Sequence, residues 1–352
     1  MSENARYWIW LQNALGYGAK IKSIIDEYKS AKLLYELGES EWKMSTVLSK
    51  RQVEKLMMTD VGESDEIIDC CSKNGYKIID FDDKAYPKRL KEIINPPAVL
   101  YVDGELPDID NLVCIGMVGT RKASEYAIKA AHIMAKGITE AGALVVSGGA
   151  LGIDTYSHLG ALACGGKTVA VLGNGLGNNY LKANEGLRNM IKQSGALVTE
   201  YQPNVPANRT SFPMRNRIIS GLSLGILVVE AGVKSGSLIT ANLAIEQNRD
   251  VYAVPASIFS SDFSGTNKLI SDGARLAINP VNVVEAYEND YPTLDLSKIR
   301  TANEIVLDNS EKTLDTSIVK KKSAKELNVK PTPENNLIDK KISSVSYTHL
   351  RA

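Results

Sequence analysis

Short apolar runs alternate with amphipathic stretches through the middle of the chain, between about residues 111 and 286. The apolar runs predict β-strands at residues 112–118, 143–146, 168–172, 196–199, 225–229 and 251–254. The stretches between them predict helices at residues 124–140, 152–164, 184–193, 213–222 and 237–247. Apolar strands separated by helices are typical of a parallel sheet that is covered on both faces. We therefore expect an α/β domain over residues 75–290, with an extended Rossmann-like, doubly wound and mostly parallel sheet.

The two ends of the chain have different patterns. Residues 5–14, 19–28, 32–37 and 51–58 carry apolar positions at helical spacing, which predicts a small helical domain over residues 1–65 of the sterile-alpha-motif (SAM) or helix-hairpin-helix type. The turn Gly16-Tyr17-Gly18 in this region could hold a DNA phosphate or serve only as a turn. Residues 76–81 and 98–102 predict two strands in a bridging segment. Residues 291–352 are polar and predict a disordered linker with a truncated or spurious C-terminal end.

Glycine-rich turns follow four of the predicted strands. Because each turn lies between a strand and a helix, all four are expected at the same edge of the sheet, where doubly wound domains bind ligands. Glycine lets the backbone approach a ligand, and successive amide groups at the start of a helix can bind an anion. The predicted phosphate-binding residues in these turns are Gly119, Thr120, Arg121, Ser147, Gly148, Gly149, Gly173, Gly175, Ser235, Gly236 and Ser237.

Basic residues occur beside the same turns and are predicted to bind phosphate with them. Arg121 ends the first turn, Lys182 follows the third, and Arg215 and Arg217 flank Asn216 in a predicted helix. Side chains two residues apart on a helix diverge by ~200°, so we do not expect both arginines in the core. The 41 basic residues balance 41 acidic ones, so a groove for nucleic acid has to be a local concentration of positive charge.

Other classes of site are disfavoured. No apolar run approaches the ~18 residues of a membrane-spanning helix, so no membrane attachment is expected. The four cysteines and three histidines lack metal-ligand spacing, which predicts no metal site, and reduced thiols fit a cytoplasmic protein. The dinucleotide fingerprint is missing, so no NAD or other cofactor is expected. Asp154, Glu200 and Glu230 could act as acid or base, but ordering its own loop explains Asp154 better, and binding the amides of a neighbouring loop explains Glu230 better.

Seven motifs resemble the DNA-processing protein A (DprA/Smf) family. They stand in the order found in that family and span about residues 75–286, which makes the resemblance specific. The motifs are Val118-Gly-Thr-Arg121, Ser147-Gly-Gly-Ala-Leu-Gly-Ile-Asp154, Ala170-Val-Leu-Gly-Asn-Gly175, Phe212-Pro-Met-Arg-Asn-Arg-Ile-Ile-Ser-Gly-Leu222, Ser235-Gly-Ser-Leu-Ile-Thr240, Arg249-Asp-Val-Tyr-Ala-Val-Pro255 and Gly265-Thr-Asn-Lys-Leu-Ile270.

The resemblance implies a bacterial cytoplasmic protein that binds single-stranded DNA and loads the RecA recombinase onto it during natural transformation and recombination. It also implies a homodimer. Separately, the sequence lacks the H-E-x-x-H and Walker motifs, so no catalytic activity is expected. The family's DNA-contacting residues correspond to Arg121 and Lys182, and its dimer contacts to Ile270 and Leu276. Residues 268–276, which contain those dimer contacts, also fit a short amphipathic helix that could simply be core.

The third glycine-rich turn departs from the family pattern. Gly177 and Leu181 stand where the family usually has Asp and Pro. These two differences bear on the shape of the turn and on the direction of Lys182.

Two other hypotheses remain. The architecture also resembles the lysine-decarboxylase-like (LOG) group of enzymes, which hydrolyse nucleoside monophosphates. That group carries P-G-G-x-G-T-x-x-E, whereas the comparable loop at residues 147–154 has no Glu at the required place. A pure assembly scaffold that bridges RecA and another protein would dimerise without affinity for DNA. A non-catalytic protein that binds single-stranded DNA is the preferred interpretation.

Overall fold

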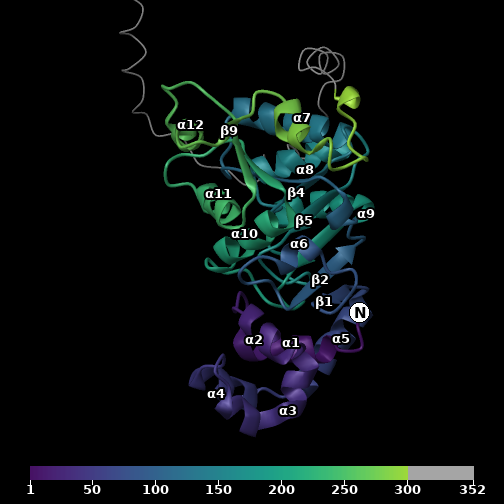
Figure 1. Ribbon diagram of the computed structural model, residues 1–352. Helices are drawn as coiled ribbons and strands as arrows, with labels where there is room; N and C mark the ends of the chain where they lie inside the picture. The colour runs from purple at the N-terminus through teal and green to yellow at the C-terminus, as the bar shows by residue number, and fades with distance from the viewer. Residues whose placement is uncertain (300–352) are drawn as a thin grey trace, which may run out of the picture. The chain divides into compact units, whose positions relative to one another are not determined.

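A nine-stranded sheet lies at the centre of the part of the chain that the structure describes. The structure is a computed structural model and describes residues 1–299 (Figure 1). Its strands are β1 (Lys77–Asp80), β2 (Val99–Gly104), β3 (Cys114–Val118), β4 (Leu144–Ser147), β5 (Thr168–Val171), β6 (Ala196–Thr199), β7 (Gly225–Val228), β8 (Asp250–Ala253) and β9 (Arg275–Leu276). β2 pairs antiparallel with β1 and β6, and the other pairs are parallel. The expected mostly parallel, doubly wound sheet is confirmed.

The strand order reverses at β3. In the order β1-β2-β6-β5-β4-β3-β7-β8-β9, β4 lies on one side of β3 and β7 on the other. Gly116 of β3 is therefore in register with both Val146 of β4 and Ile226 of β7. Ligands bind such sheets beyond the carboxyl ends of the strands at the point of reversal. The fold thus marks the ends of β3 and β7 as the position for a site.

Helices cover both faces of the sheet because side chains alternate along each strand. On β3, Cys114 and Val118 belong to one face, while Ile115 and Met117 belong to the other. The first face packs against α6 (Lys88–Lys91), α10 (Ser211–Leu222) and α11 (Ser237–Glu246). The second packs against α7 (Glu125–Glu140), α8 (Ile153–Ala163), α9 (Glu185–Ser194) and α13 (Val281–Val284). Across residues 1–299, no helix has both the length and the hydropathy needed to cross a membrane.

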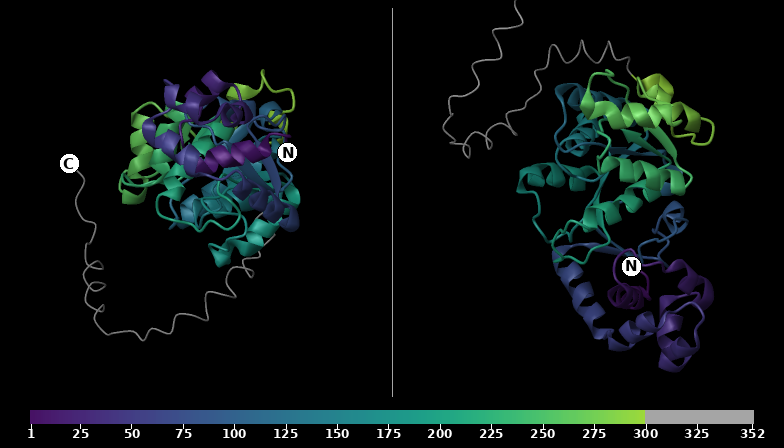
Figure 2. Two further views of the ribbon diagram at one scale, coloured as in Figure 1. Left: turned by 90° about the horizontal axis from the view of Figure 1, so that it is seen from below. Right: turned by 90° about the vertical axis from the view of Figure 1, so that its left-hand side faces the viewer.

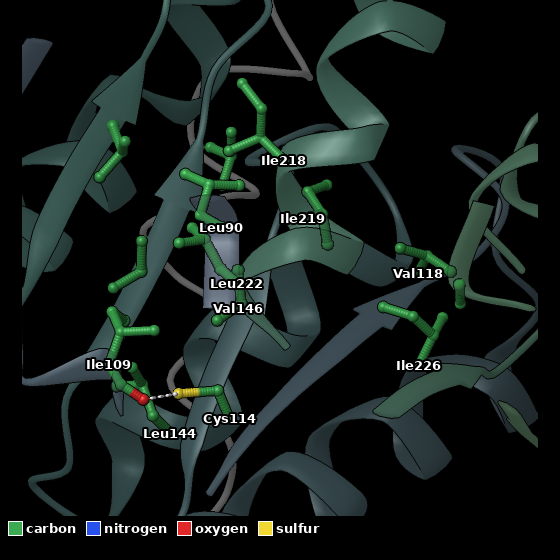
Figure 3. Close-up of a cluster of buried hydrophobic side chains, with 14 of the residues drawn as sticks. Leu90, Ile109, Cys114, Val118, Leu144, Val146, Ile218, Ile219, Leu222 and Ile226 are labelled. Carbon is green, nitrogen blue, oxygen red and sulfur yellow. Dashed lines mark hydrogen bonds between the residues drawn. The ribbon is translucent and has the colours of Figure 1, made fainter. Parts of the chain in front are cut away.

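Apolar packing fixes how α10 is turned against the sheet. Figure 3 shows Ile218, Ile219 and Leu222 of this helix within the buried cluster. In the same cluster the Cys114 thiol donates a hydrogen bond to the Ile109 carbonyl at 3.6 Å (Figure 3). Burying each such side chain stabilises the fold by about 1.5–3 kcal/mol. The earlier residues of α10 are thereby held at the carboxyl edge of the sheet.

The N-terminal residues form five helices beside β1 and β2 (Figures 1 and 2). They are α1 (Ala5–Leu15), α2 (Lys22–Tyr28), α3 (Ala31–Met44), α4 (Lys50–Met58) and α5 (Gly62–Asn74). The first four correspond to the predicted helices, although α3 continues well past the predicted end at residue 37. α5 was not predicted and crosses the expected boundary at residue 65. Trp8 and Trp10 share one buried cluster with Val99 and Tyr101 of β2. The helices therefore pack directly on the edge of the sheet.

The Gly16-Tyr17-Gly18 turn packs against the α/β region. The Tyr17 ring lies 4.5 Å from the Tyr201 ring, measured between centroids, and Gly18 lies against Met214 of α10. Both glycines have positive φ, as a tight turn requires. The turn forms one wall of a cavity that also contains two glutamates, which would repel a phosphate. These contacts support the interpretation of Gly16–Gly18 as a structural turn.

The C-terminal part of the described chain corrects two expectations. Residues 268–276 are not one helix, because α12 (Ser264–Ser271) ends before the edge strand β9 begins. Residues 291–299 are not part of a disordered linker. Leu294 is buried against α7 and α13, and the Asp295 amide donates to the Ala141 carbonyl at 2.8 Å. The rest of the predicted linker and chain end, residues 300–352, lies outside the described residues.

Candidate nucleic-acid interface

A cavity of about 630 Å³ opens where β3 and β7 end, at the point predicted by the strand order. Its walls come from the turns after both strands, from the loop before α8 and from the first turns of α10 and α11. The lining residues are Val118, Gly119, Thr120, Arg121, Ala150, Asp154, Tyr180, Arg209, Phe212, Pro213, Arg215, Asn216, Ile219, Ser235, Gly236, Ser237, Ile239 and Thr240.

Eight of the predicted site residues meet in this cavity. The first glycine-rich turn and the fourth both line it, and α10 contributes two more residues. These eight are Gly119, Thr120, Arg121, Arg215, Asn216, Ser235, Gly236 and Ser237. The cavity contains three arginines and one carboxylate, so it concentrates positive charge within a chain of zero net charge.

Aromatic side chains lie beside the exposed Arg121. The Arg121 guanidinium carbon is 4.9 Å from the centroid of the Phe212 ring, and the Tyr180 and Phe212 ring centroids are 5.4 Å apart. Both rings are partly exposed in the cavity wall. Nucleobases stack on such rings, and a guanidinium over a ring adds a cation–π contact. The arrangement therefore offers a phosphate contact and a base contact side by side.

Arg215 is buried in the cavity wall without a hydrogen bond. Its exposed fraction is 4%, and its Nε is buried without a partner. Within residues 1–299 the guanidinium forms no salt bridge. Burial lowers its pKa, which the charge of Asp154 partly offsets. A Cβ atom on Gly148 would lie 1.7 Å from Nη1 of Arg215, so only glycine leaves room for the guanidinium here. Gly148 therefore leaves space for Arg215 but does not itself line the cavity.

Asp154 and His158 are buried close to Arg215. As predicted, Asp154 orders its own loop, since its carboxylate accepts from the Ala150 amide at 3.3 Å. Burial raises the Asp154 pKa, and Arg215 opposes that shift. Burial lowers the pKa of His158 to about 3, and Arg215 adds to that effect. A neutral His158 adds no second cation behind Arg215.

The structure corrects the prediction that Arg217 binds phosphate. Its guanidinium forms a bidentate ion pair with Glu200 at 2.7 and 2.6 Å, and both residues are almost fully buried. Its Nε also donates to the Asn95 carbonyl at 3.0 Å. Arg215 and Arg217 are thus both buried, contrary to the expectation from helical geometry, because the two sides of this helix face different buried surfaces. Arg217 and Glu200 belong to the core and not to the site.

The second and third glycine-rich turns contribute less than predicted. Ser147 is fully buried and donates to the Met117 carbonyl at 2.6 Å, and Gly149 is also buried outside the cavity. Gly173 packs against the Phe212 ring, and the Gly175 amide donates to the Val205 carbonyl at 2.9 Å. These residues are therefore not available to bind phosphate directly. They allow close packing behind the cavity.

Several backbone amides at the site are also occupied within the protein. The Thr120 amide donates to the Glu230 carbonyl at 2.9 Å, and the Ser237 amide donates to the Ser235 hydroxyl at 3.4 Å. Fewer amides than expected are therefore free to bind an anion. The three arginines of the cavity add their charge to the attraction that the remaining amides provide.

Glu230 behaves as predicted from its position. Its carboxylate accepts from the Ser124 amide at 2.9 Å at the start of α7, and burial raises its pKa. It does not line the cavity. Glu230 is therefore not placed beside a ligand in this cavity, as a hydrolase that used this residue would require.

Lys182 lies on an exposed turn close to the cavity. It starts a short 3-10 helix (Lys182–Asn184) two residues after Tyr180, and its side chain is exposed. Leu181 has φ +60°, a conformation that proline cannot adopt, so the departure from the family pattern does change this turn. Arg188 of α9 donates to the Tyr180 and Leu181 carbonyls and to Asn179. It thereby fixes the turn that carries Lys182.

Several cavity residues were not predicted from the sequence. Arg209 is exposed in the wall, while Tyr180 and Phe212 form the aromatic pair. Phe212 was within a quoted motif, but motifs alone do not distinguish a core ring from an exposed one. Arg209 stands two residues before α10 begins, and a basic residue before a helix start was the available signal.

The two predicted dimer residues lie at the far edge of the sheet. Ile270 is half-buried on α12, and Leu276 has an exposed fraction of 47% on the edge strand β9. An exposed apolar side chain on an edge strand is accessible to a partner.

Comparison with known proteins identifies the family. Residues 77–288 match the family of DNA recombination-mediator protein A. The chain belongs to this family. It is 39% identical over 213 residues to the DNA processing protein DprA of Bacillus subtilis (strain 168), covering 60% of this chain and 72% of the relative. It is 36% identical over 241 residues to Protein Smf of Escherichia coli (strain K12), covering 68% and 64% of the two chains.

Two solved structures of family members share this fold. The structure of DNA processing protein A from Streptococcus pneumoniae has a TM-score of 0.70 and 31% identity, over 81% of this chain and 98% of that chain. A structure of the Helicobacter pylori protein, which reports its single-stranded DNA binding mode, has a TM-score of 0.56 and 29% identity, over 61% and 97% of the chains. The resemblance inferred from the motifs is confirmed.

Proposed function

We propose that this protein binds single-stranded DNA at the cavity beyond β3 and β7, without catalysing a reaction. The observation that supports it most is the grouping of Arg121, Phe212 and Tyr180 around one opening. Aromatic rings bind bases only when the bases are unpaired, whereas cations bind phosphates of either form of DNA. Both groups side by side therefore favour a single strand over a duplex.

The basic residues outline a path for the strand. Arg121 and Arg209 are exposed at the cavity, and Lys182 follows Tyr180 on the adjacent turn. None of the three forms an ion pair within residues 1–299. We place consecutive phosphates on these cations. Sequence preference is expected to be slight, since phosphate contacts carry no base information.

Relatives support the same assignment. The family is that of a DNA recombination mediator, and the Helicobacter pylori relative is described by its single-stranded DNA binding mode. We propose that this chain acts likewise in the cytoplasm, delivering the bound strand to RecA during natural transformation and recombination. We also propose a homodimer through Ile270 and Leu276. Leu276→Glu is then expected to convert a dimer into a monomer in light scattering.

The DNA assignment is tested by gel shifts with single- and double-stranded oligonucleotides of equal length across a salt series. We expect the single strand to bind more tightly at every salt concentration, with affinity falling steeply as salt rises because phosphate counterions are released. Equal binding of the two forms, or no binding of either at low salt, would refute the proposal.

A further inference from the structure

Arg215, the buried arginine in the cavity wall, is not paired by any group of the described protein. Arg215 is 4% exposed and has no hydrogen-bond or salt-bridge partner in residues 1–299, and Asp154 is the carboxylate that acts on it electrostatically. Burying an unpaired charge is costly, so such groups are usually paired or bound to a ligand. The other arginine of the same helix, Arg217, is fully paired with Glu200. The unpaired state of Arg215 therefore indicates an anionic ligand.

A second buried polar group lines the same cavity. Thr240 of α11 is 1% exposed, and its hydroxyl has no partner in the described part of the chain. It lies in the first turns of a ten-residue helix, whose N-terminal end carries partial positive charge. A cation, a hydroxyl and a helix N-terminus in one buried wall form a site for an oxyanion.

Arg215 and Thr240 lie deeper in the protein than the exposed cations at the cavity opening. Arg121 and Arg209 can contact a strand that passes over the opening, whereas Arg215 and Thr240 are reached only by a group that enters the cavity. An internal phosphodiester would have to bring the chain in and out again, while a terminal phosphate needs one nucleotide inside. The volume of about 630 Å³ is that of a small-ligand pocket and suits a single nucleotide.

We propose that Arg215 and Thr240 form a subsite for a phosphate monoester, supplied by the end of the bound strand. A monoester carries about −1.5 to −2 charges at pH 7, against one for a phosphodiester. It therefore compensates a buried guanidinium better. The subsite rests on the proposed DNA-binding function. It extends that function, because it predicts that the protein recognises a phosphorylated end as well as the phosphates along the strand.

The test uses the full chain and an oligo(dT) with an internal fluorescent label, so that both ends of the strand stay free. It compares strands that differ only in their ends. Fluorescence anisotropy is measured with hydroxyl ends, a 5′-phosphate, a 3′-phosphate and a circular strand of equal length. We expect one phosphorylated end to bind about tenfold more tightly than hydroxyl ends, as one charge-assisted contact provides. The circular strand should bind like the hydroxyl-ended one. Equal affinities for all four, or equal gains at both ends, would overturn the subsite, whereas no binding of any strand would refute the DNA function itself.

Free nucleotide separates the two sources of a monoester. If the subsite accepts any nucleoside monophosphate, dTMP should displace the phosphorylated strand while thymidine does not. If it needs the strand end, dTMP should not compete although the end preference remains. Either result supports a monoester subsite, and competition by thymidine equal to that of dTMP would contradict it.

Two variants and a control test whether Arg215 and Thr240 cause the preference for a phosphorylated end. Arg215→Met should reduce the preference for the phosphorylated end to less than about twofold, and Thr240→Val gives the same test if circular dichroism shows Arg215→Met to be unfolded. The control is Thr139→Val on α7, which also removes a buried hydroxyl without a partner but lies outside the cavity. It should retain the preference. Persistence of the preference in both site variants, or its loss in the control, would overturn the proposal.

Discussion

Two arginines on one helix differ in what surrounds them. Arg217 donates to both oxygens of Glu200 and to two carbonyls, and the whole group is buried. Arg215, two residues earlier, is just as buried and donates to nothing within residues 1–299. The first arginine is satisfied by the protein and stabilises its fold, whereas the second is satisfied only when an anion enters the cavity. Exposure alone therefore does not separate a structural arginine from a binding one.

The largest expected effect on stability comes from breaking the ion pair between Arg217 and Glu200. Arg217→Met should lower the free energy of unfolding by about 3–5 kcal/mol, because Glu200 is left buried and unpaired. Arg215→Met should change it by less than about 1 kcal/mol, since no hydrogen bond is lost. Urea denaturation of both variants measures the difference. Similar losses in the two variants would contradict the contrast between them.

The double variant Arg217→Met/Glu200→Gln is the control for this result. It removes both charges, so we expect it to recover part of the lost stability. A double variant less stable than Arg217→Met would show that the loss comes from packing and not from the unpaired carboxylate.

The next largest effect on stability comes from His158, which is neutral in the folded protein. Its pKa is about 3 in the fold against an ordinary value of 6.5, so between these values the unfolded chain binds the proton that the folded chain excludes. The resulting stability is complete above pH 6.5 and is lost as pH falls toward 3. The loss should approach about 1.4 kcal/mol per pH unit for one proton. The cause is burial of the imidazole, to which the charge of Arg215 adds. A proton on Nε2 would also be buried without an acceptor, because Nε2 has no partner within residues 1–299.

Denaturation of the protein and of His158→Gln between pH 7 and pH 4.5 measures this loss. The variant should be less stable at pH 7 but should show a shallower pH dependence. Parallel pH profiles for the two proteins would exclude His158 as the group responsible.

The sequence predicted the strands well because their apolar runs are continuous in a sheet buried on both faces. It also identified the first and fourth turns, since glycine and basic residues occur together there. It could not separate Arg215 from Arg217, because Glu200 is 17 residues away along the chain and meets Arg217 only through the packing of α10 on the sheet. It missed α5, whose acidic face hides its few apolar positions, and β9, which has two residues.

A smaller effect on stability is expected at Gly148. Gly148→Ala places a methyl group on the Arg215 guanidinium, which can move because it is the flexible end of a side chain. Stability should therefore fall by less than about 1 kcal/mol, while the preference for a phosphorylated strand end falls because the cation is displaced. Gly186→Ala on α9, where an added methyl group meets nothing within 4 Å, is the matched control. It should leave the preference for a phosphorylated end unchanged and slightly raise stability.

The central claim is that the cations beside the cavity hold a single DNA strand. Its most direct test is the affinity of Arg121→Ala/Lys182→Ala for an oligo(dT) at moderate salt, against Lys50→Ala/Arg51→Ala, which removes two exposed charges from α4. We predict that the first variant loses at least about tenfold in affinity and shows a shallower salt dependence, while the second binds like the unmodified protein. Unchanged affinity in the first variant, or equal losses in both, would contradict the account.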